Sequence, residues 1–165
     1  MNGVIAFAFW SSTFLNPDAP ILEGLTVREV PGFMQLGVSS VHFQKETIGS
    51  ELAFYNGENY AFGPLQPFLS ASITNDGGAW LGYGFVNSIE VSDQFGFKFK
   101  FAPGAYMAGQ EVDLGGWLMF KSGIELEYSL SDWKFSVGYD HRSSGDIWEY
   151  NPGMETLQLS VSKKK

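Results

Sequence analysis

The sequence lacks three features that would each point to a class of protein. None of its 165 residues is cysteine, which excludes disulfide frameworks, thiolate metal sites and cysteine nucleophiles. Its 10 lysines and arginines are outnumbered by 18 acidic residues, so the formal net charge of -8 leaves no basic surface for a nucleic-acid backbone. No run reaches the roughly 18 to 20 consecutive apolar residues of a membrane-spanning helix. The sequence therefore argues against a nucleic-acid-binding protein and against a helical membrane protein.

Glycine and aromatic residues are abundant in a chain of one domain's length. Hydrophobic residues make up 44% and aromatic residues 16% of the chain, which contains 20 glycines and 15 phenylalanines. These residues are distributed among many short segments, and this composition suits antiparallel strands joined by tight turns. We therefore expect a single all-β domain.

Apolar and polar residues alternate from Phe33 to the end of the chain, and turn residues divide the alternation into short runs. The predicted strands span residues 33–43, 49–56, 64–74, 79–88, 94–107, 116–130, 132–143 and 153–162. Single-chain bacterial outer-membrane barrels have an even number of strands, and this set satisfies that condition.

The two faces of these strands differ in a way that favours a barrel in lipid. In "FGFKFKFAP" the four phenylalanines share one face, while Lys98 and Lys100 lie on the other. The next predicted strand places Glu125 and Glu127 on its polar face, where they can pair with the lysines inside a narrow barrel. We therefore predict an eight-stranded antiparallel transmembrane β-barrel of the outer-membrane type. The alternative is a soluble, lipocalin-like barrel with its apolar face inward.

The predicted barrel domain covers residues 33–165 and ends in a hairpin that we expect to be catalytic, for the reasons below. Residues 1–32 precede it as an N-terminal arm or signal remnant. The stretch "MNGVIAFAFW" has an apolar core but lacks the positively charged start of a secretory signal. A signal remnant, an extra strand and a plain arm all remain open for this stretch.

Three polar residues interrupt the apolar face of the last two predicted strands. Steps of two from Trp133 place His141 and Ser143 on the outward face, and a step back from Leu157 places Glu155 there as well. A short connection between antiparallel neighbours brings their near ends together, so the three side chains should converge at one rim. A serine nucleophile, a histidine base and a carboxylate that orients the histidine are the parts of nucleophilic catalysis.

Neighbouring residues either complete this set or compete with it. The Ser144 hydroxyl and the backbone N–H groups near Gly145 are candidates for an oxyanion hole. Asp140, which points inward by parity, and Asp146, in the connection, are alternatives to Glu155 as the orienting acid. In the non-catalytic alternative the polar residues only mark the membrane boundary, where they meet lipid headgroups and water.

The same residues carry a resemblance to a known family. The two stretches read His141-Arg142-Ser143-Ser144 and Asn151-Pro152-Gly153-Met154-Glu155. They resemble the lipid A 3-O-deacylase family of the PagL type, often labelled acyloxyacyl hydrolase-like, whose pattern is His-x-Ser-Asn, a short loop and Asn-x-Gly-x-Glu before the last strand. The spacings from histidine to serine and from serine to glutamate agree with that pattern. Ser144 departs from it, because the family has an asparagine there that supports the oxyanion hole.

The resemblance implies an eight-stranded barrel in the outer membrane of a Gram-negative bacterium, with catalytic residues on its outer surface near the outer leaflet. It implies hydrolysis of the ester that holds the 3-position acyl chain on lipid A. The expected partners are lipid A, as part of lipopolysaccharide, and the membrane, and we expect neither a cofactor nor a metal. Two rival functions stay open: a structural or adhesive barrel with an inactive triad, and an esterase acting on other lipids. The residues leave open whether the protein forms a homodimer.

Two basic side chains have less defined expected roles. Arg142, beside the candidate nucleophile, is the candidate contact for a lipid phosphate because a guanidinium can grip phosphate in two places. The alternative for Arg142 is an interfacial side chain that snorkels toward water. His42, at the end of the first predicted strand, has no comparable partners in the pattern, so we expect it to be structural or exposed.

Overall fold

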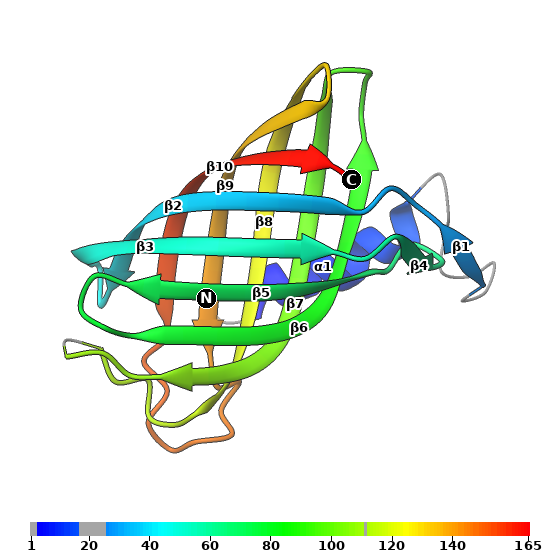
Figure 1. Cartoon of the computed structure of the whole chain (residues 1–165). Helices are drawn as coiled ribbons and strands as arrows, with labels where there is room; N and C mark the ends of the chain where they lie inside the picture. Colours follow the sequence, from blue (N-terminus) through cyan, green and yellow to red (C-terminus); the bar gives the residue numbers. More distant parts are fainter. Residues whose placement is uncertain (1–2, 17–25, 111) are drawn as a thin grey trace.

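Antiparallel pairing joins eight strands edge to edge until the last strand meets the first. The computed structural model describes residues 3–16, 26–110 and 112–165. The barrel strands are β2 (Phe33–Phe43), β3 (Glu46–Gly57), β5 (Gln66–Thr74), β6 (Ala79–Glu90), β7 (Phe95–Met107), β8 (Leu118–Leu130), β9 (Trp133–Ser143) and β10 (Met154–Lys164). β10 pairs with both β9 and β2, which closes the barrel (Figure 1). The predicted all-β fold and eight-stranded antiparallel barrel are confirmed.

The two ends of the barrel carry different connections. The end that we call the terminal rim holds the start of β2 and the end of β10. The opposite end, the loop rim, holds the connections 44–45, 75–78, 108–117 and 144–153. Outer-membrane barrels have short periplasmic turns and longer extracellular loops. The two longest connections of the barrel, 108–117 and 144–153, therefore indicate that the loop rim faces outside, although the terminal rim also carries the connection 58–65.

Ion pairs occupy the barrel interior, on the polar face predicted from the alternation. Lys98 Nζ lies 2.8 Å from a carboxylate oxygen of Glu127, and Lys100 Nζ lies 2.5 Å from one of Glu125. All four side chains are buried. Because these charges lie inside, the lipocalin-like alternative with its apolar face inward is wrong, and the predicted lysine–glutamate pairing is confirmed.

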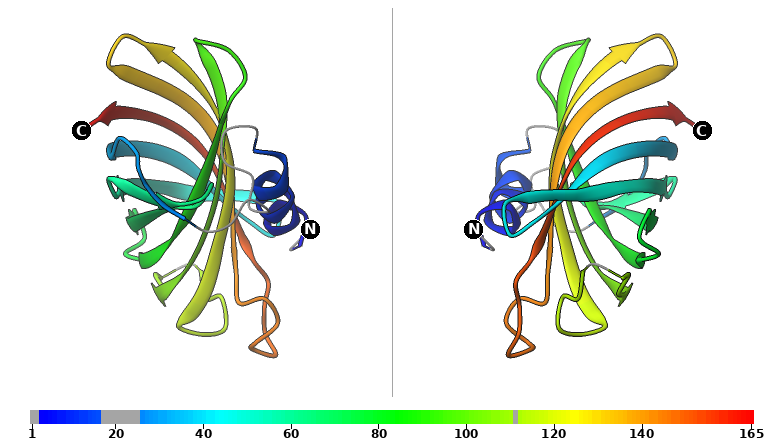
Figure 2. Two further views of the ribbon diagram at one scale, coloured as in Figure 1. Left: turned by 90° about the vertical axis from the view of Figure 1, so that its right-hand side faces the viewer. Right: turned by 90° about the vertical axis from the view of Figure 1, so that its left-hand side faces the viewer.

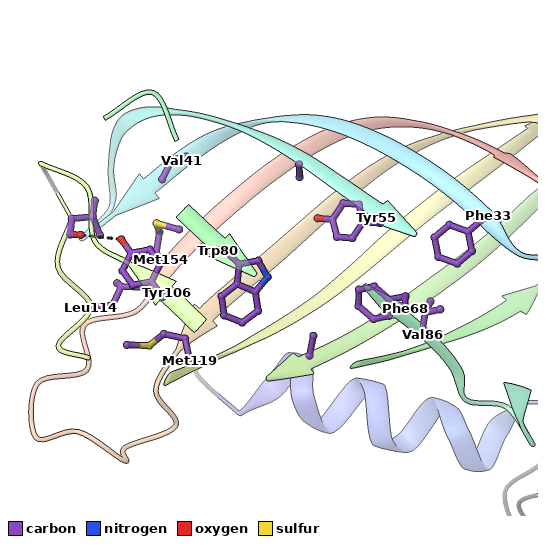
Figure 3. Packing of buried hydrophobic residues seen from close by; sticks show 13 residues of the cluster. Phe33, Val41, Tyr55, Phe68, Trp80, Val86, Tyr106, Leu114, Met119 and Met154 are labelled. Atoms are coloured by element: carbon purple, nitrogen blue, oxygen red, sulfur yellow. Dashed lines mark hydrogen bonds between the residues drawn. The ribbon is translucent and has the colours of Figure 1, made fainter. Parts of the chain in front are cut away.

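Aromatic side chains fill much of the remaining interior. Figure 3 shows Phe33 and Phe68 toward one end, Trp80 and Tyr106 toward the other, and Tyr55 between them. The Lys100 ammonium lies 4.2 Å from the centre of the Tyr55 ring, so the polar and aromatic groups also contact each other. An eight-stranded barrel is narrow enough for side chains to fill it in this way.

The outer wall of the barrel is apolar. The exposed side chains on it include Met34, Leu36, Val38, Leu52, Leu69, Ile73, Leu81, Phe95, Leu126, Phe135, Val137, Leu157 and Leu159. They come from every barrel strand, and soluble monomers rarely expose so continuous an apolar surface. An apolar outside with a polar inside is the arrangement of a barrel that lies in lipid.

A helix precedes the barrel and packs on its outer wall. α1 (Val4–Leu15) lies against β6, β7 and β8 (Figure 2). The Phe9 and Trp10 rings lie 5.8 and 6.4 Å from the Phe101 ring. The alternative in which this stretch forms an extra strand is therefore wrong for residues 4–10, which are helical. Residues 17–25 of the predicted arm lie outside the described residues. In the described part of the chain, no helix is both long and apolar enough to span a membrane.

Hydrogen bonds among three polar side chains hold α1 against the barrel. Asn87 of β6 lies on the outer face. Its Oδ1 accepts a hydrogen bond from Asn16 Nδ2 at 2.6 Å, and its Nδ2 donates to Ser12 Oγ at 2.9 Å. All three side chains are buried. A buried amide without hydrogen bonds is costly in apolar surroundings, so these bonds favour the docked position of the helix.

At the terminal rim, β1 (Val27–Glu29) and β4 (Tyr60–Phe62) form a separate two-stranded sheet.

Candidate active site

The end of β9 places alternate side chains on opposite sides of the barrel wall. Asp140 and Arg142 face the interior, where both form ion pairs, so His141 and Ser143 face outward. Ser143 is the last residue of β9 at the loop rim, and its cross-strand partner on β8 is Phe120. The candidate base and the candidate nucleophile therefore share one face of one strand.

Glu155 meets His141 across the hairpin. The two residues are directly opposite in the β9–β10 register, and Glu155 Oε1 lies 3.3 Å from His141 Nδ1. The Glu155 side chain keeps a quarter of its surface exposed, whereas His141 is almost fully buried. A carboxylate at Nδ1 keeps the proton on that nitrogen and leaves Nε2 as the basic one, which is the tautomer that a general base needs.

His141 Nε2 is buried and has no hydrogen-bond partner among the described residues. Ser143 lies next along the same face, yet within the described ranges no hydrogen bond joins its Oγ to the ring. His141 and Ser143 are only 3% and 4% exposed, so both lie recessed in the outer wall. The structure thus brings His141 and Glu155 into contact and places Ser143 beside them without the serine–histidine bond.

Gly153, in the connection between β9 and β10, makes room for the His141 ring. A Cβ at this position would lie 2.8 Å from His141 Cε1, closer than real Cβ contacts allow. The backbone of Gly153 also has a φ of +72°, in the region that glycine tolerates best. Both constraints require glycine two residues before Glu155, which gives the Gly-x-Glu part of the motif a physical reason.

Asn151 holds the start of the connection in place. Its Oδ1 accepts a hydrogen bond from the Ser144 backbone N–H at 2.9 Å, and its Nδ2 donates to Asp146 Oδ1 at 2.8 Å. The Ile147 N–H donates to the Ser144 carbonyl at 3.3 Å and tightens the same turn. The asparagine of the motif therefore orders the backbone that follows Ser143.

The expected oxyanion donors are only partly available. The Ser144 N–H is used by Asn151, but the Ser144 hydroxyl is buried and has no hydrogen-bond partner among the described residues. Gly145 follows with a φ of +61°, and in the described structure its N–H is not bonded to another residue. The Ser144 hydroxyl and the Gly145 N–H are thus the donors that the turn leaves free.

Arg142 does not lie where either of its expected roles requires. Its guanidinium points into the barrel, donates to Glu51 at 2.8 Å and lies 5.0 Å from the Trp80 ring. The side chain is 2% exposed. A phosphate contact and a snorkelling side chain both need the outer wall, and the period of two in a strand turns Arg142 away from it. The structure therefore corrects this placement.

The other acids near the hairpin are engaged elsewhere. Asp140 forms ion pairs with Lys100 and Lys121 inside the barrel, each at 3.4 Å, and Asp146 accepts from Asn151. Glu155 is thus the acid in contact with His141. The described residues contain no group of three or more histidine, aspartate or glutamate side chains placed to hold a metal ion.

The expectation that His42 has no comparable partners is wrong. Its Nε2 lies 2.9 Å from Ser40 Oγ and its Nδ1 lies 3.1 Å from Thr47 Oγ1. The spacing of two between Ser40 and His42 is the same signal that singled out His141 and Ser143, and it could have been read from the sequence. Glu155 lies opposite His42 as well as His141, because β10 runs between β2 and β9.

The fold and the polar set at the loop rim define an outer-membrane β-barrel with a candidate hydrolytic site on its outer wall. The chain belongs to the family described as lipid A 3-O-deacylase (PagL), whose model matches residues 28–164. Family and fold together place the protein in the outer membrane of a Gram-negative bacterium.

Solved structures of other barrels are similar to this fold. The crystal structure of the outer membrane enzyme PagL superimposes with a TM-score of 0.62 at 13% identity, covering 79% of this chain and 98% of that chain. A de novo designed transmembrane β-barrel gives 0.57 at 14% identity, covering 84% and 98%. Neisserial surface protein A gives 0.55 at 11% identity, covering 85% and 99%. These likenesses show the fold, and no curated protein sequence matches the chain.

Proposed function

We propose that the protein is a serine esterase that removes the ester-linked 3-position acyl chain of lipid A, with Ser143 as nucleophile, His141 as base and Glu155 as orienting acid. The observation that carries this proposal is the 3.3 Å contact between Glu155 and His141 Nδ1, which leaves Nε2 free on the face that Ser143 shares. Membership of the lipid A 3-O-deacylase family supports the choice of substrate.

The reaction has two halves. In the first half Ser143 Oγ moves to His141 Nε2, which takes the hydroxyl proton as Oγ attacks the ester carbonyl. The bond from the acyl carbon to the sugar oxygen then breaks, the imidazolium protonates that oxygen to give the sugar hydroxyl, and an acyl-Ser143 ester remains. Water attacks this ester with His141 again as base, and the fatty acid leaves. Glu155 stabilises the imidazolium in both halves.

Developing negative charge on the carbonyl oxygen needs donors near Ser143. The Ser144 hydroxyl and the Gly145 N–H are the groups free for this task. Removing one oxyanion donor typically costs on the order of 10² to 10³ in rate, so the Ser144 hydroxyl has to replace the family's asparagine for high activity.

An aromatic surface adjoins the nucleophile on the lipid side. Phe120, the cross-strand partner of Ser143, stacks on Phe101 with ring centres 5.9 Å apart, and Phe101 contacts Phe9 of α1. An acyl chain of a lipid in the outer leaflet has apolar surface to follow along these rings. The site therefore suits an ester that a lipid presents to the barrel wall from the side.

Mass spectrometry of lipid A from Gram-negative cells that express the wild type, Ser143→Ala or Ser50→Ala tests the proposal. Ser50 also faces outward near the loop rim and has no histidine partner among the described residues, so Ser50→Ala is a matched control. Loss of one 3-hydroxyacyl group is expected with the wild type and Ser50→Ala, and full-length lipid A with Ser143→Ala.

Two other results would redirect the assignment. Intact lipid A in all strains, together with release of fatty acid from phospholipids by the wild type and Ser50→Ala but not by Ser143→Ala, would indicate an esterase for other lipids. Intact lipids and no labelling of folded wild type by a fluorophosphonate would indicate a barrel without catalysis. The absence of a serine–histidine bond at Ser143 makes this second comparison necessary.

A further inference from the structure

A second serine–histidine pair lies on the outer wall, and it is already hydrogen-bonded. Ser40 Oγ lies 2.9 Å from His42 Nε2, and Thr47 Oγ1 lies 3.1 Å from His42 Nδ1. Among the described residues this is the only hydrogen bond between a serine and a histidine side chain. The pair thus has the contact that a histidine needs to take a proton from a serine.

Ser40 and His42 face lipid. Along β2 the outward positions begin with Met34, Leu36 and Val38, which are exposed, and steps of two lead to Ser40 and His42. Both side chains are half-buried and therefore remain accessible from the outer wall.

The tautomer required of His42 is compatible with its contacts. If Nδ1 carries the proton and donates it to Thr47 Oγ1, Nε2 accepts the Ser40 hydroxyl proton. Thr47 then fills the place at Nδ1 that Glu155 fills for His141. Glu155 lies directly opposite His42 in the β2–β10 register, but its carboxylate contacts His141, so Thr47 is the partner at His42 Nδ1.

The two serines lie at different depths. β2 and β9 both run toward the loop rim, and Glu155 is level with both histidines. Ser143 lies beyond its histidine toward the rim, whereas Ser40 lies before its histidine. At about 3.3 Å per residue, Ser40 is roughly 13 Å farther from the rim along the strands than Ser143.

We propose that Ser40, with His42 as base, is a second nucleophile of the outer wall that reacts with acyl esters of membrane lipids deeper in the outer leaflet than those that reach Ser143. His42 Nε2 takes the Ser40 proton while Oγ forms a bond to the acyl carbon. The bond from that carbon to the alcohol oxygen breaks, and the alcohol leaves with the proton from His42. Water then hydrolyses acyl-Ser40 to the free fatty acid. This proposal does not depend on Ser143.

The test uses a long-chain alkyl fluorophosphonate on the purified, refolded barrel in detergent, with the labelled peptides mapped by mass spectrometry. Ser143→Ala is expected to keep an adduct on Ser40, and Ser40→Ala/Ser143→Ala is expected to lose it. His42→Gln in the Ser143→Ala background should slow labelling of Ser40 by on the order of 100-fold, the lower range for loss of a general base. Ser50, the cross-strand partner of Ser40, is the internal control and should stay unlabelled.

Each variant is first shown to be folded, by testing whether the barrel resists unfolding in cold detergent. A folded Ser143→Ala barrel without an adduct on Ser40 would overturn the proposal, and so would equal labelling of Ser40 with and without His42. In the Ser40→Ala variant, labelling of Ser143 measures the reactivity of the Ser143 site by itself. That result tests only the proposed lipid A esterase.

Discussion

His141 Nδ1 lies 3.3 Å from Glu155 Oε1 across the hairpin of β9 and β10. The direct cross-strand register of the two residues brings the side chains together, and the connection 144–153 is shaped so that the histidine ring fits beneath it. Local backbone geometry therefore holds the candidate base and its acid in place.

Glu155→Gln should lower kcat for lipid A deacylation on the order of 10⁴-fold, because an amide can hold His141 in the wrong tautomer and does not stabilise its charged form. Glu149→Gln is the matched control, since Glu149 is an exposed acid in the same connection. Steady-state release of fatty acid by the purified variants measures the effect. Equal rates for Glu155→Gln and the control would remove Glu155 from the mechanism.

Gly153→Ala should reduce activity strongly, because the added methyl group would lie 2.8 Å from His141 Cε1 and would push the ring away from Ser143. Gly77→Ala separates this contact from backbone strain. Gly77 also has a left-handed φ, of +93°, but a Cβ there meets nothing within 4 Å. We expect Gly77→Ala to destabilise the fold by about 1 kcal/mol with near wild-type kcat. Similar kcat values for the two variants would contradict the steric explanation.

Arg142→Met should destabilise the barrel by about 3 to 5 kcal/mol, because it leaves the Glu51 carboxylate buried with one partner fewer. The double variant Arg142→Met/Glu51→Gln should recover a large part of this loss. Lys134→Met is the milder comparison, since the Lys134 side chain is 15% exposed and also pairs with the exposed Glu90. Urea titrations in lipid vesicles measure the free energy of unfolding. A stable Arg142→Met that binds lipid A poorly would instead favour an outer-wall role.

The docked position of α1 can be tested with engineered cysteines, because the chain contains none of its own. Ser12→Cys/Asn87→Cys should form a disulfide on mild oxidation in the membrane, since the two wild-type side chains are hydrogen-bonded at 2.9 Å. Ser11→Cys/Asn87→Cys should not, because one residue along a helix turns the side chain by about 100°. The disulfide is detected by gel electrophoresis after the chain is cut with a protease, because crosslinked fragments migrate together. Equal yields for both pairs would mean that α1 is not held in one position.

Much of the fold could be predicted because a strand has the simplest periodicity in proteins. The alternation of Phe95–Met107 and Leu118–Leu130 directly encodes which side chains meet lipid and which meet one another inside. The same period of two placed the two lysines and the two glutamates on the inner face, where they pair, whereas the structure decided that Lys98 meets Glu127 and Lys100 meets Glu125. The short helix α1 was missed because Val4–Trp10 is apolar at every position, so no polar face distinguishes helix from strand there.

The candidate site was only partly readable from the sequence. Parity placed His141, Ser143 and Glu155 on one wall, and the same parity already turned Arg142 inward, so its proposed phosphate contact was an error of interpretation. The pairing of β10 with β2 places His42 opposite Glu155. This strand pairing closes the barrel and joins residues more than a hundred positions apart in the sequence. No local pattern encodes such a closure.

The sequence by itself determined the strands, their inner and outer faces and the spacing of the polar residues in the last hairpin, because these follow from local alternation and turn chemistry. Only the tertiary structure decided which strands are neighbours, and with that the ion pair of Arg142 with Glu51 and the position of Glu155 between two histidines. Strand pairing depends on long-range hydrogen bonds and on packing inside a closed sheet, which are properties of the whole chain.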